Sequence, residues 1–416
     1  MARSFKVKRA VAAVAVATAL FFLCPPSSWA SPSVEGLPSW LRESAERAST
    51  AVWSELDNKG LSHDAMADTF ALVMGRIFSG YQVELIWRDS DPVLKMTAKD
   101  PSHWVVEMIY PEVPEPPISW LREDGEKVAS LLGSHLSSIP YQALSWGDEA
   151  LRSLVSDSLS LHLPGWKGSV VVRLKEDISV IELSVYPSPP LILATYPSIY
   201  SGTLPNLLRE GLRESLIKDM VPLLGLPVPW VEKHEVQVNR WAVAALERRN
   251  TVINSNALVS LSITPGEIAR VEGTVDSRRY VLRAWLSAQA GGGGRSPEFG
   301  LHLGRIVQVF PNWDWELYGE GILELEDWNL ESRWGLRWAI DGPLWLGAEY
   351  VAPDNRLWYR LWLEGNVKGP YLWWRYSEDR DNQGALGYRL NQTISLELHY
   401  DDRYDDRWSI RAVGDL

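Results

Sequence analysis

The sequence predicts an α+β protein in which three tandem modules of about 80 residues, each with two helices and a small sheet, precede a C-terminal antiparallel β-barrel of eight to ten strands. Two observations predict this organisation. A short motif at a helix start recurs twice between residues 37 and 290, and from residue 296 onward large apolar residues alternate with charged ones. A fixed period indicates tandem modules, and alternation with period two indicates strands.

Residues 1–30 have the pattern of a secretory signal peptide. Four basic residues precede an apolar stretch at 10–23, and Ser28-Trp29-Ala30 fits a small-x-small cleavage site. Cleavage there removes Cys24, the only cysteine, so we expect a mature chain without disulfides or cysteine metal sites. The alternative is a lipoprotein anchored through Cys24. The net charge of −12 becomes more negative without the basic start, which disfavours nucleic acid as a partner.

The repeated motif marks the start of each predicted module. Leu37-Pro38-Ser39-Trp40-Leu41-Arg42-Glu43 returns as Ser119-Trp120-Leu121-Arg122-Glu123 and as Leu204-Pro205-Asn206-Leu207-Leu208-Arg209-Glu210. Ser39, Ser119 and Asn206 are the expected helix N-caps. The motif is either a binding face or a capped helix with core Trp and Leu, and we favour the second interpretation. The predicted modules are 37–116, 117–203 and 204–290.

Each module is expected to continue with a second helix and then strands. The second helices are predicted at 63–77, 147–158 and 232–248. The strands are predicted at 82–87, 93–97 and 104–110 in the first module, 170–174 and 178–186 in the second, and 258–263, 269–275 and 280–286 in the third. Proline-rich joints at 111–117 and 187–190 are expected to be stiff spacers. The glycines within 291–295 are expected to form a flexible hinge before a barrel at 296–416.

The predicted barrel has one oily and one charged face. Trp313, Trp315 and Leu317 alternate with Asp314 and Glu316, and later segments repeat the pattern. Alternation alone leaves open which face is outside. We favour a membrane barrel with the apolar face toward lipid, because the many large apolar side chains would overfill a small barrel interior. Tryptophans on the charged face argue for the soluble alternative, namely Trp345, Trp358, Trp362 and Trp373.

The charged face predicts a neutralised lumen, closed as a plug. Lys368 is the only lysine after Gly291, and a face built from Arg and Glu suits enclosed bidentate pairs. The residues expected to form this lumen network are Glu316, Glu320, Glu324, Glu331, Arg333, Arg337, Glu349, Arg360, Glu364, Arg375, Arg389, Glu397 and Arg411.

Signals for catalysis are sparse, and we expect no enzymatic activity, cofactor or metal site. The histidines show no His-x-x-x-His spacing, and no nucleophile-elbow or P-loop motif occurs. The segment 232–235 is interpreted as a charged helix start, and the acidic segments 379–384 and 401–406 as surface loops. A barrel enzyme acting on lipid would have to use His302, Ser395 or His399.

Two-helix modules with a small sheet, placed between a signal peptide and a C-terminal barrel, resemble the POTRA-plus-barrel superfamily of outer-membrane assembly factors and two-partner secretion transporters. The resemblance implies that module 37–116 and its repeats are POTRA-like. It also implies a periplasmic arm that binds unfolded clients by adding their strands to its sheet edges, and a barrel that anchors or inserts them. A POTRA module has a strand ahead of its first helix, and none is evident before Ser39. The family's Arg-Gly-aromatic lid motif is absent from 296–416, so no functional residue is carried over.

These observations predict a non-enzymatic outer-membrane protein with a periplasmic N-terminal part. Its expected partners are outer-membrane lipid and unfolded or envelope protein clients. The alternative is a soluble periplasmic protein whose Trp-rich barrel binds polysaccharide or lipid.

Overall fold

The computed structural model describes residues 31–59, 62–88, 91–175, 178–291, 295–310, 313–365 and 368–416. The predicted signal peptide lies outside these residues. The described chain forms two compact units, one ending at Tyr186 and the other beginning at Pro187. Among the described residues, no helix is long and apolar enough to cross a membrane.

The first module begins with a strand that the sequence did not reveal. Its elements are β1 (Ser33–Glu35), α2 (Ser39–Asp57), α3 (His63–Ile77), β2 (Tyr81–Arg88) and β3 (Asp91–Ala98). The sheet order is β1-β3-β2, and β1 runs parallel to β3. A strand of three residues is too short to show period-two alternation, which is why it escapes sequence analysis.

The second module contains a strand that we had expected in the first. Its elements are β4 (His103–Ile109), α4 (Pro117–Leu136), η1 (Tyr141–Ala143), α5 (Leu144–His162), β5 (Trp166–Lys175) and β6 (Ile178–Pro187). β4 pairs in parallel with β6 in a sheet ordered β4-β6-β5. The Trp104 indole donates a hydrogen bond to the Ile139 carbonyl at 2.8 Å, which ties β4 to this module. The expected assignment of 104–110 to the first module was therefore wrong.

The first two modules share packed contacts within the first unit. Trp146 of α5 packs edge-on against Phe78, with ring centroids 4.8 Å apart, and against Tyr81 at 6.0 Å. A Cβ atom on Gly147 would lie 2.7 Å from the Leu41 side chain, so glycine allows this close approach. These contacts join the core of α2 and α3 to the start of α5.

The third module repeats the arrangement with more broken helices. Its elements are β7 (Ala194–Tyr200), α6 (Asn206–Asp219), η2 (Val221–Leu223), α7 (Val228–Lys233), α8 (Glu235–Glu247), α9 (Asn250–Ser255), β8 (Ala257–Thr264) and β9 (Ile268–Ser277). The sheet order is β7-β9-β8, with β7 parallel to β9. The expected single helix at 232–248 is divided at His234, which leaves helical geometry with ψ near 16°. His234 is buried beside Trp230, so 232–235 is part of a packed helix junction.

The repeated motif serves the cores of the modules. Leu41 and Leu121 are fully buried, as the core-packing interpretation expects, whereas Trp40 and Trp120 are only partly buried and Leu207 of the third copy is 77% exposed. The expected N-caps were wrong by one position or more, because Ser39 and Asn206 are the first helical residues and Ser119 lies inside α4. Proline occupies the N-cap position in all three helices, where its missing N–H is not needed.

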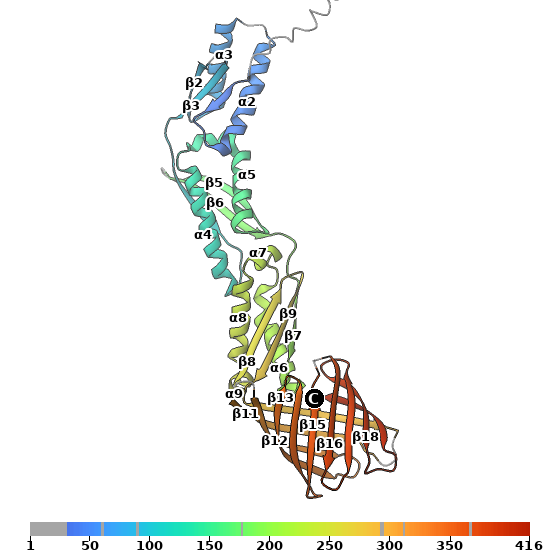
Figure 1. Cartoon of the computed structure of the whole chain (residues 1–416). Helices are drawn as coiled ribbons and strands as arrows, with labels where there is room; N and C mark the ends of the chain where they lie inside the picture. The colour runs from blue at the N-terminus through green and yellow to red at the C-terminus, as the bar shows by residue number, and fades with distance from the viewer. Residues whose placement is uncertain are drawn as a thin grey trace, which may run out of the picture. The chain divides into compact units, whose positions relative to one another are not determined.

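The barrel is closed and has ten strands, which confirms the predicted fold class (Figure 1). Its strands are β10 (Tyr280–Ala290), β11 (Glu298–Phe310), β12 (Trp313–Glu324), β13 (Leu330–Asp341), β14 (Leu344–Ala352), β15 (Arg356–Leu363), β16 (Gly369–Ser377), β17 (Asn382–Arg389), β18 (Ile394–Asp401) and β19 (Trp408–Asp415). Every strand is antiparallel to its neighbours, and β10 pairs with both β11 and β19 to close the ring.

The start of the barrel lies earlier than expected. Residues 280–286 were expected in the third module, but β10 is the first strand of the barrel and follows β9 after two residues. The expected hinge therefore falls between two strands of the barrel and not before it, and its residues 292–294 lie outside the described residues. The reason for the error is physical, because alternation predicts a strand without saying which sheet the strand joins.

Candidate functional site

The barrel turns its charged face inward. On β12, Glu316 and Tyr318 are 0% and 2% exposed, whereas Leu317 between them is 63% exposed. The same alternation continues on β13, where Arg333 and Arg337 are buried and Trp334 is exposed. The two faces of each strand thus meet different surroundings, and the apolar one is on the outside.

The outer wall of the barrel carries a belt of exposed large apolar side chains. In a soluble protein such a surface would be an association site, whereas in a membrane barrel it contacts lipid chains. The belt includes Leu301, Leu303, Leu317, Leu336, Tyr359, Trp374, Leu386, Leu396, Leu398 and Ile410.

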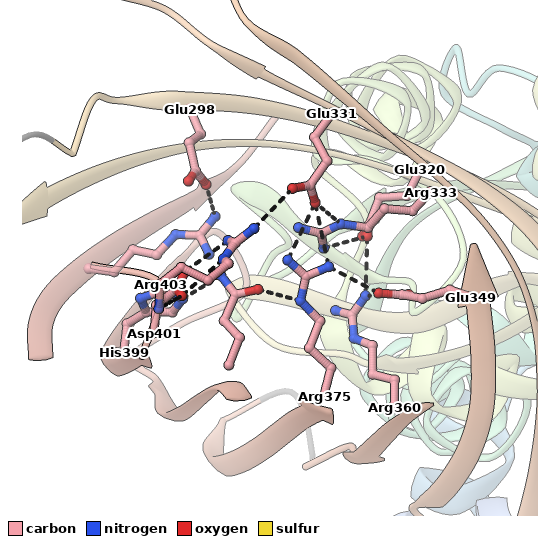
Figure 2. Close-up of polar contacts among 12 residues, drawn as sticks. Glu298, Glu320, Glu331, Arg333, Glu349, Arg360, Arg375, His399, Asp401 and Arg403 are labelled. Carbon is pink, nitrogen blue, oxygen red and sulfur yellow. Dashed lines mark hydrogen bonds and ion pairs between the residues drawn. The ribbon is translucent and has the colours of Figure 1, made fainter. Parts of the chain in front are cut away.

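Two buried glutamates and three arginines form the centre of the interior (Figure 2). Glu320 accepts from Arg333 at 2.9 Å and from Arg360 at 3.1 Å. Glu349 accepts from Arg360 at 3.3 Å and from Arg375 at 3.2 Å. Because Arg360 contacts both glutamates, the pairs form one connected network across the five consecutive strands β12 to β16.

A second group of ion pairs lies around Glu316. His302 places its Nε2 2.7 Å from Glu316 Oε1, and Arg337 donates to the other carboxylate oxygen at 2.6 Å. Arg337 also donates to Glu364 at 2.8 Å, and Glu364 lies 3.5 Å from Arg283. This group links the middle of the barrel to the start of β10.

A third group contacts the strands that close the barrel. Arg411 of β19 donates to Glu298 of β11 at 2.6 Å and lies 3.6 Å from Glu397 of β18. Tyr371 donates a hydrogen bond to Glu397 at 2.7 Å. The ion pairs therefore reach across β10, which lies between β19 and β11 in the ring.

A fourth group of ion pairs lies near the ends of the strands. Glu331 accepts from Arg333 at 2.5 Å and lies 3.6 Å from Arg403, which in turn pairs with Asp401 at 2.8 Å (Figure 2). Arg375 also hydrogen bonds to Gln383. These contacts place Glu331 between three guanidinium groups, since Arg375 lies 3.4 Å away.

The interior tryptophans stack on the arginines. Arg337 lies 4.6 Å above the Trp345 ring, and Arg360 lies 4.6 Å above the Trp362 ring. Arg375 lies 4.4 Å from the centroid of Trp358. Indoles on the charged face are thus compatible with a polar lumen, because cation–π contacts stabilise guanidinium groups taken out of water.

Eleven of the thirteen residues expected in the lumen network take part in the ion pairs described above. Of the other two, Glu324 is at the end of β12, and Arg389 lines the interior cavity, donates to the Gly365 carbonyl at 3.0 Å and stacks on Tyr371. Several further members were not expected from the sequence, although all of them except Arg403, which lies in the turn after β18, continue the same period-two alternation. These are Arg283, Glu298, His302, Tyr318, Asp401 and Arg403.

The residues considered for lipid chemistry do not lie at a lipid-facing rim. His302 is enclosed between Glu316 and Glu320, and His399 is buried beside Gln383, 3.2 Å away. Ser395 accepts a hydrogen bond from Tyr371 at 3.0 Å. Across the described ranges, no group of three His, Cys, Asp or Glu side chains is placed to hold a metal ion.

A cavity of about 190 Å³ remains among the charged groups, lined by residues that include Trp285 and Arg411. A wider space of about 630 Å³ lies where the third module meets the barrel, lined by residues that include Gly202, Arg283 and Lys368. Charged side chains are among the lining residues of both, and both are large enough for water.

No protein-family model matches the chain, and no curated protein matches it. Among solved structures, BamA from Haemophilus ducreyi lacking POTRA domains 1–3 aligns at 10% identity over 74% of this chain and 72% of that chain, with a TM-score of 0.17. The N-terminal domain of Omp85 from Thermosynechococcus elongatus aligns at 10% identity over 61% of this chain and 99% of that chain, with a TM-score of 0.20. CdiB from Acinetobacter baumannii aligns at 11% identity over 84% of this chain and 70% of that chain, with a TM-score of 0.17.

Each module has the order strand, two helix segments or more, strand, strand, with the third strand in the middle of the sheet. Three such modules followed by a closed barrel form the arrangement that the resemblance to the POTRA-plus-barrel superfamily implies.

Proposed function

We propose that this protein is an outer-membrane β-barrel with a periplasmic modular arm, and that it acts without enzymatic activity as an anchor in envelope protein assembly or secretion. The observation that carries the proposal is the division of the barrel wall, with exposed Leu317 beside fully buried Glu316. A lipid environment stabilises the first side chain, and an enclosed lumen with Arg337 stabilises the second.

The ion-pair network supports a closed barrel. Opposite charges face each other across the lumen, as in the pairs of Glu349 with Arg360 and Arg375. A wide water-filled channel would leave these groups solvated and separate. We therefore propose that the barrel anchors the chain and conducts no steady ion current.

The arm is proposed to bind extended segments of client proteins. In each three-stranded sheet the third strand is central, so the first and second strands are edges with free backbone groups. β5 is such an edge and carries the exposed side chain of Val171. An extended client segment can add to such an edge through main-chain hydrogen bonds.

The soluble alternative, a Trp-rich barrel binding polysaccharide, requires the apolar face to fill the interior. Buried Arg375 and Glu349, together with exposed Leu398, do not support that arrangement.

The test is an alkaline-carbonate wash of the envelope fraction from cells that express the full chain. We expect the protein to stay in the pellet and to leave it only with detergent. Release into the supernatant would overturn the proposed membrane location, and the polysaccharide alternative would then be tested with a glycan-binding screen.

The client-binding part is tested separately by site-specific photo-crosslinking in cells. A photoreactive residue at Val171, on the edge of the second sheet, is expected to capture envelope proteins. The same residue at Leu161, an exposed position on α5, is the matched control. Equal capture at both positions would count against binding at the sheet edge.

A further inference from the structure

The outer wall of the barrel has a groove on one side. Its volume is about 650 Å³, and its lining comes from strands β11 to β15. Pockets of this size take a single small-molecule ligand in other proteins. The groove opens outward, because Leu303 and Leu317, which line it, are 59% and 63% exposed.

Small residues form the floor of the groove. Gly321 of β12 lies directly opposite Ser332 of β13, and Gly319 lies opposite Trp334. On β14, Ala348 lies opposite Leu336. The wall is thin at Gly319, Gly321 and Ala348, because these residues carry no large side chain.

The floor is open at Gly321. A Cβ atom built there would meet only the Leu330 side chain, at 3.9 Å. On the other side of the barrel, Gly384 offers a contrast, because a Cβ there would lie 2.5 Å from the Trp374 ring. A neighbouring indole therefore fills the space over Gly384, whereas the space over Gly321 stays empty of protein.

Large apolar side chains form the sides of the groove. Trp334 stands beside Gly319, with its ring 3.0 Å from where a Cβ would be. Tyr350 lies opposite Trp334 on β14, and its hydroxyl donates to Asn355 at 2.8 Å, near the end of the strand. The ring of Tyr350 thus borders the groove while its polar end is already bonded.

We propose that this groove binds one acyl chain of a membrane lipid. The inference rests on the proposed membrane location of the barrel. It is favoured by the continuity of the groove with the exposed apolar belt and by side walls of Leu, Trp and Tyr. A protein partner needs roughly 800 Å² of surface on each side, whereas a groove of this volume suits a single chain. Along its length, van der Waals contact with Gly321, Trp334 and Leu303 holds the chain.

The experiment uses the full-length protein in phosphatidylcholine vesicles that contain a phospholipid with a diazirine in its acyl chain. After illumination, labelled peptides are mapped by mass spectrometry. We expect labelling concentrated on peptides containing Leu303, Trp334 and Tyr350. Labelling of equal yield on peptides of the opposite wall, such as the one containing Leu398, would overturn the inference.

Variants that fill the groove provide the second arm. Gly321→Leu is expected to lower labelling of the groove by about tenfold, the change expected when roughly two methylene contacts are lost. Ser332→Leu fills the same floor from the neighbouring strand and serves if Gly321→Leu does not fold. Ala412→Leu, at an exposed outward position on β19, is the matched control and should leave labelling unchanged.

Two outcomes separate the inference from the function on which it rests. If carbonate strips the wild-type protein from the vesicles, the proposed membrane location fails. If the protein is retained but Gly321→Leu labels like wild type, only the lipid groove is overturned. Crosslinks between two copies of the chain at Trp334, lost in Gly321→Leu, would replace the lipid by a second copy and also overturn the inference.

Discussion

Arg209 of α6 donates a hydrogen bond to Asp415 of β19 at 2.5 Å, although 206 positions separate them in the chain. Arg209 is 5% exposed and also contacts Gln392, in the turn between β17 and β18, at 3.3 Å. Arg209 belongs to the third copy of the repeated motif. In the third copy, Arg209 therefore connects the third module to the last strand of the barrel.

Removing this contact should loosen the third module from the barrel. Arg209→Ala leaves Asp415 without its closest partner, which we expect to cost about 2 kcal/mol locally. Hydrogen exchange of the full chain in detergent should then show faster exchange in α6 and in the 390–393 turn. Arg213→Ala is the matched control, because Arg213 pairs with Glu210 on the same helix. The hydrogen bond from Arg213 holds the pKa of the Glu210 carboxyl below its usual range. Equal exchange in both variants would contradict the role of Arg209.

Glu349 should be the acidic residue that the barrel interior tolerates losing least. Glu349→Ala leaves Arg360, Arg375 and the Tyr318 hydroxyl without their shared acceptor. Breaking a buried charge network in this way costs about 3–5 kcal/mol. Denaturant titration in micelles, followed by Trp fluorescence, should show a lower midpoint.

The double variant Glu349→Ala/Arg375→Ala provides the control for uncompensated charge. It removes one charge of each sign, so part of the lost stability should return. If the double variant loses more stability than the two single variants lose together, the loss is not caused by an uncompensated buried charge.

In planar bilayers, the wild-type barrel should show no steady current, and Glu349→Ala should increase the rate of brief openings.

The fold could be predicted in outline because the sequence contains two repeating patterns. One is the motif at the start of each module, and the other is the period-two alternation of the barrel strands. Strands such as β12 show clean alternation of Leu317 with Glu316 and Tyr318, and this alternation predicts both the strand and its two faces. It could not predict which face is outside, because a soluble and a membrane barrel share the same pattern. It also could not assign β10 to the barrel, since strand pairing depends on contacts with β19, more than 100 residues away.

The interior network could be predicted by residue type but not by pairing. Arg and Glu on one face indicate ion pairs, yet the pairs of Arg360 with both Glu320 and Glu349 depend on how three strands bring side chains across the lumen. His302 was overlooked as a network member for a similar reason. An isolated histidine gives no signal until register places it opposite Glu320.

An outward-facing charge should disrupt the barrel only if lipid surrounds it. Leu398 lies near the middle of β18 and is exposed. Leu398→Arg should destabilise the barrel in vesicles by about 2–4 kcal/mol if the position is near the bilayer midplane. Folding yield into vesicles, measured by protection from protease, should fall accordingly.

The matched control is Asp354→Arg, in the turn between β14 and β15, which should insert normally. In an aqueous setting an exposed Leu→Arg change is nearly neutral. Normal insertion of Leu398→Arg would therefore argue for a soluble barrel.

Tyr81 should make the first module sensitive to high pH. Its side chain is 2% exposed, and burial raises the pKa of its phenol to about 12. In the unfolded chain the pKa is near 10, so ionisation favours unfolding above that pH. Stability is full below about pH 10 and falls by up to about 2 kcal/mol as pH rises to 12. Tyr81→Phe removes the titrating group and keeps the ring contact with Trp146. The measurement is hydrogen exchange of β2 between pH 9 and pH 11.5, corrected for intrinsic rates. The exchange rate should rise more steeply with pH in wild type than in Tyr81→Phe. Parallel profiles would show that ionisation of Tyr81 does not destabilise the first module.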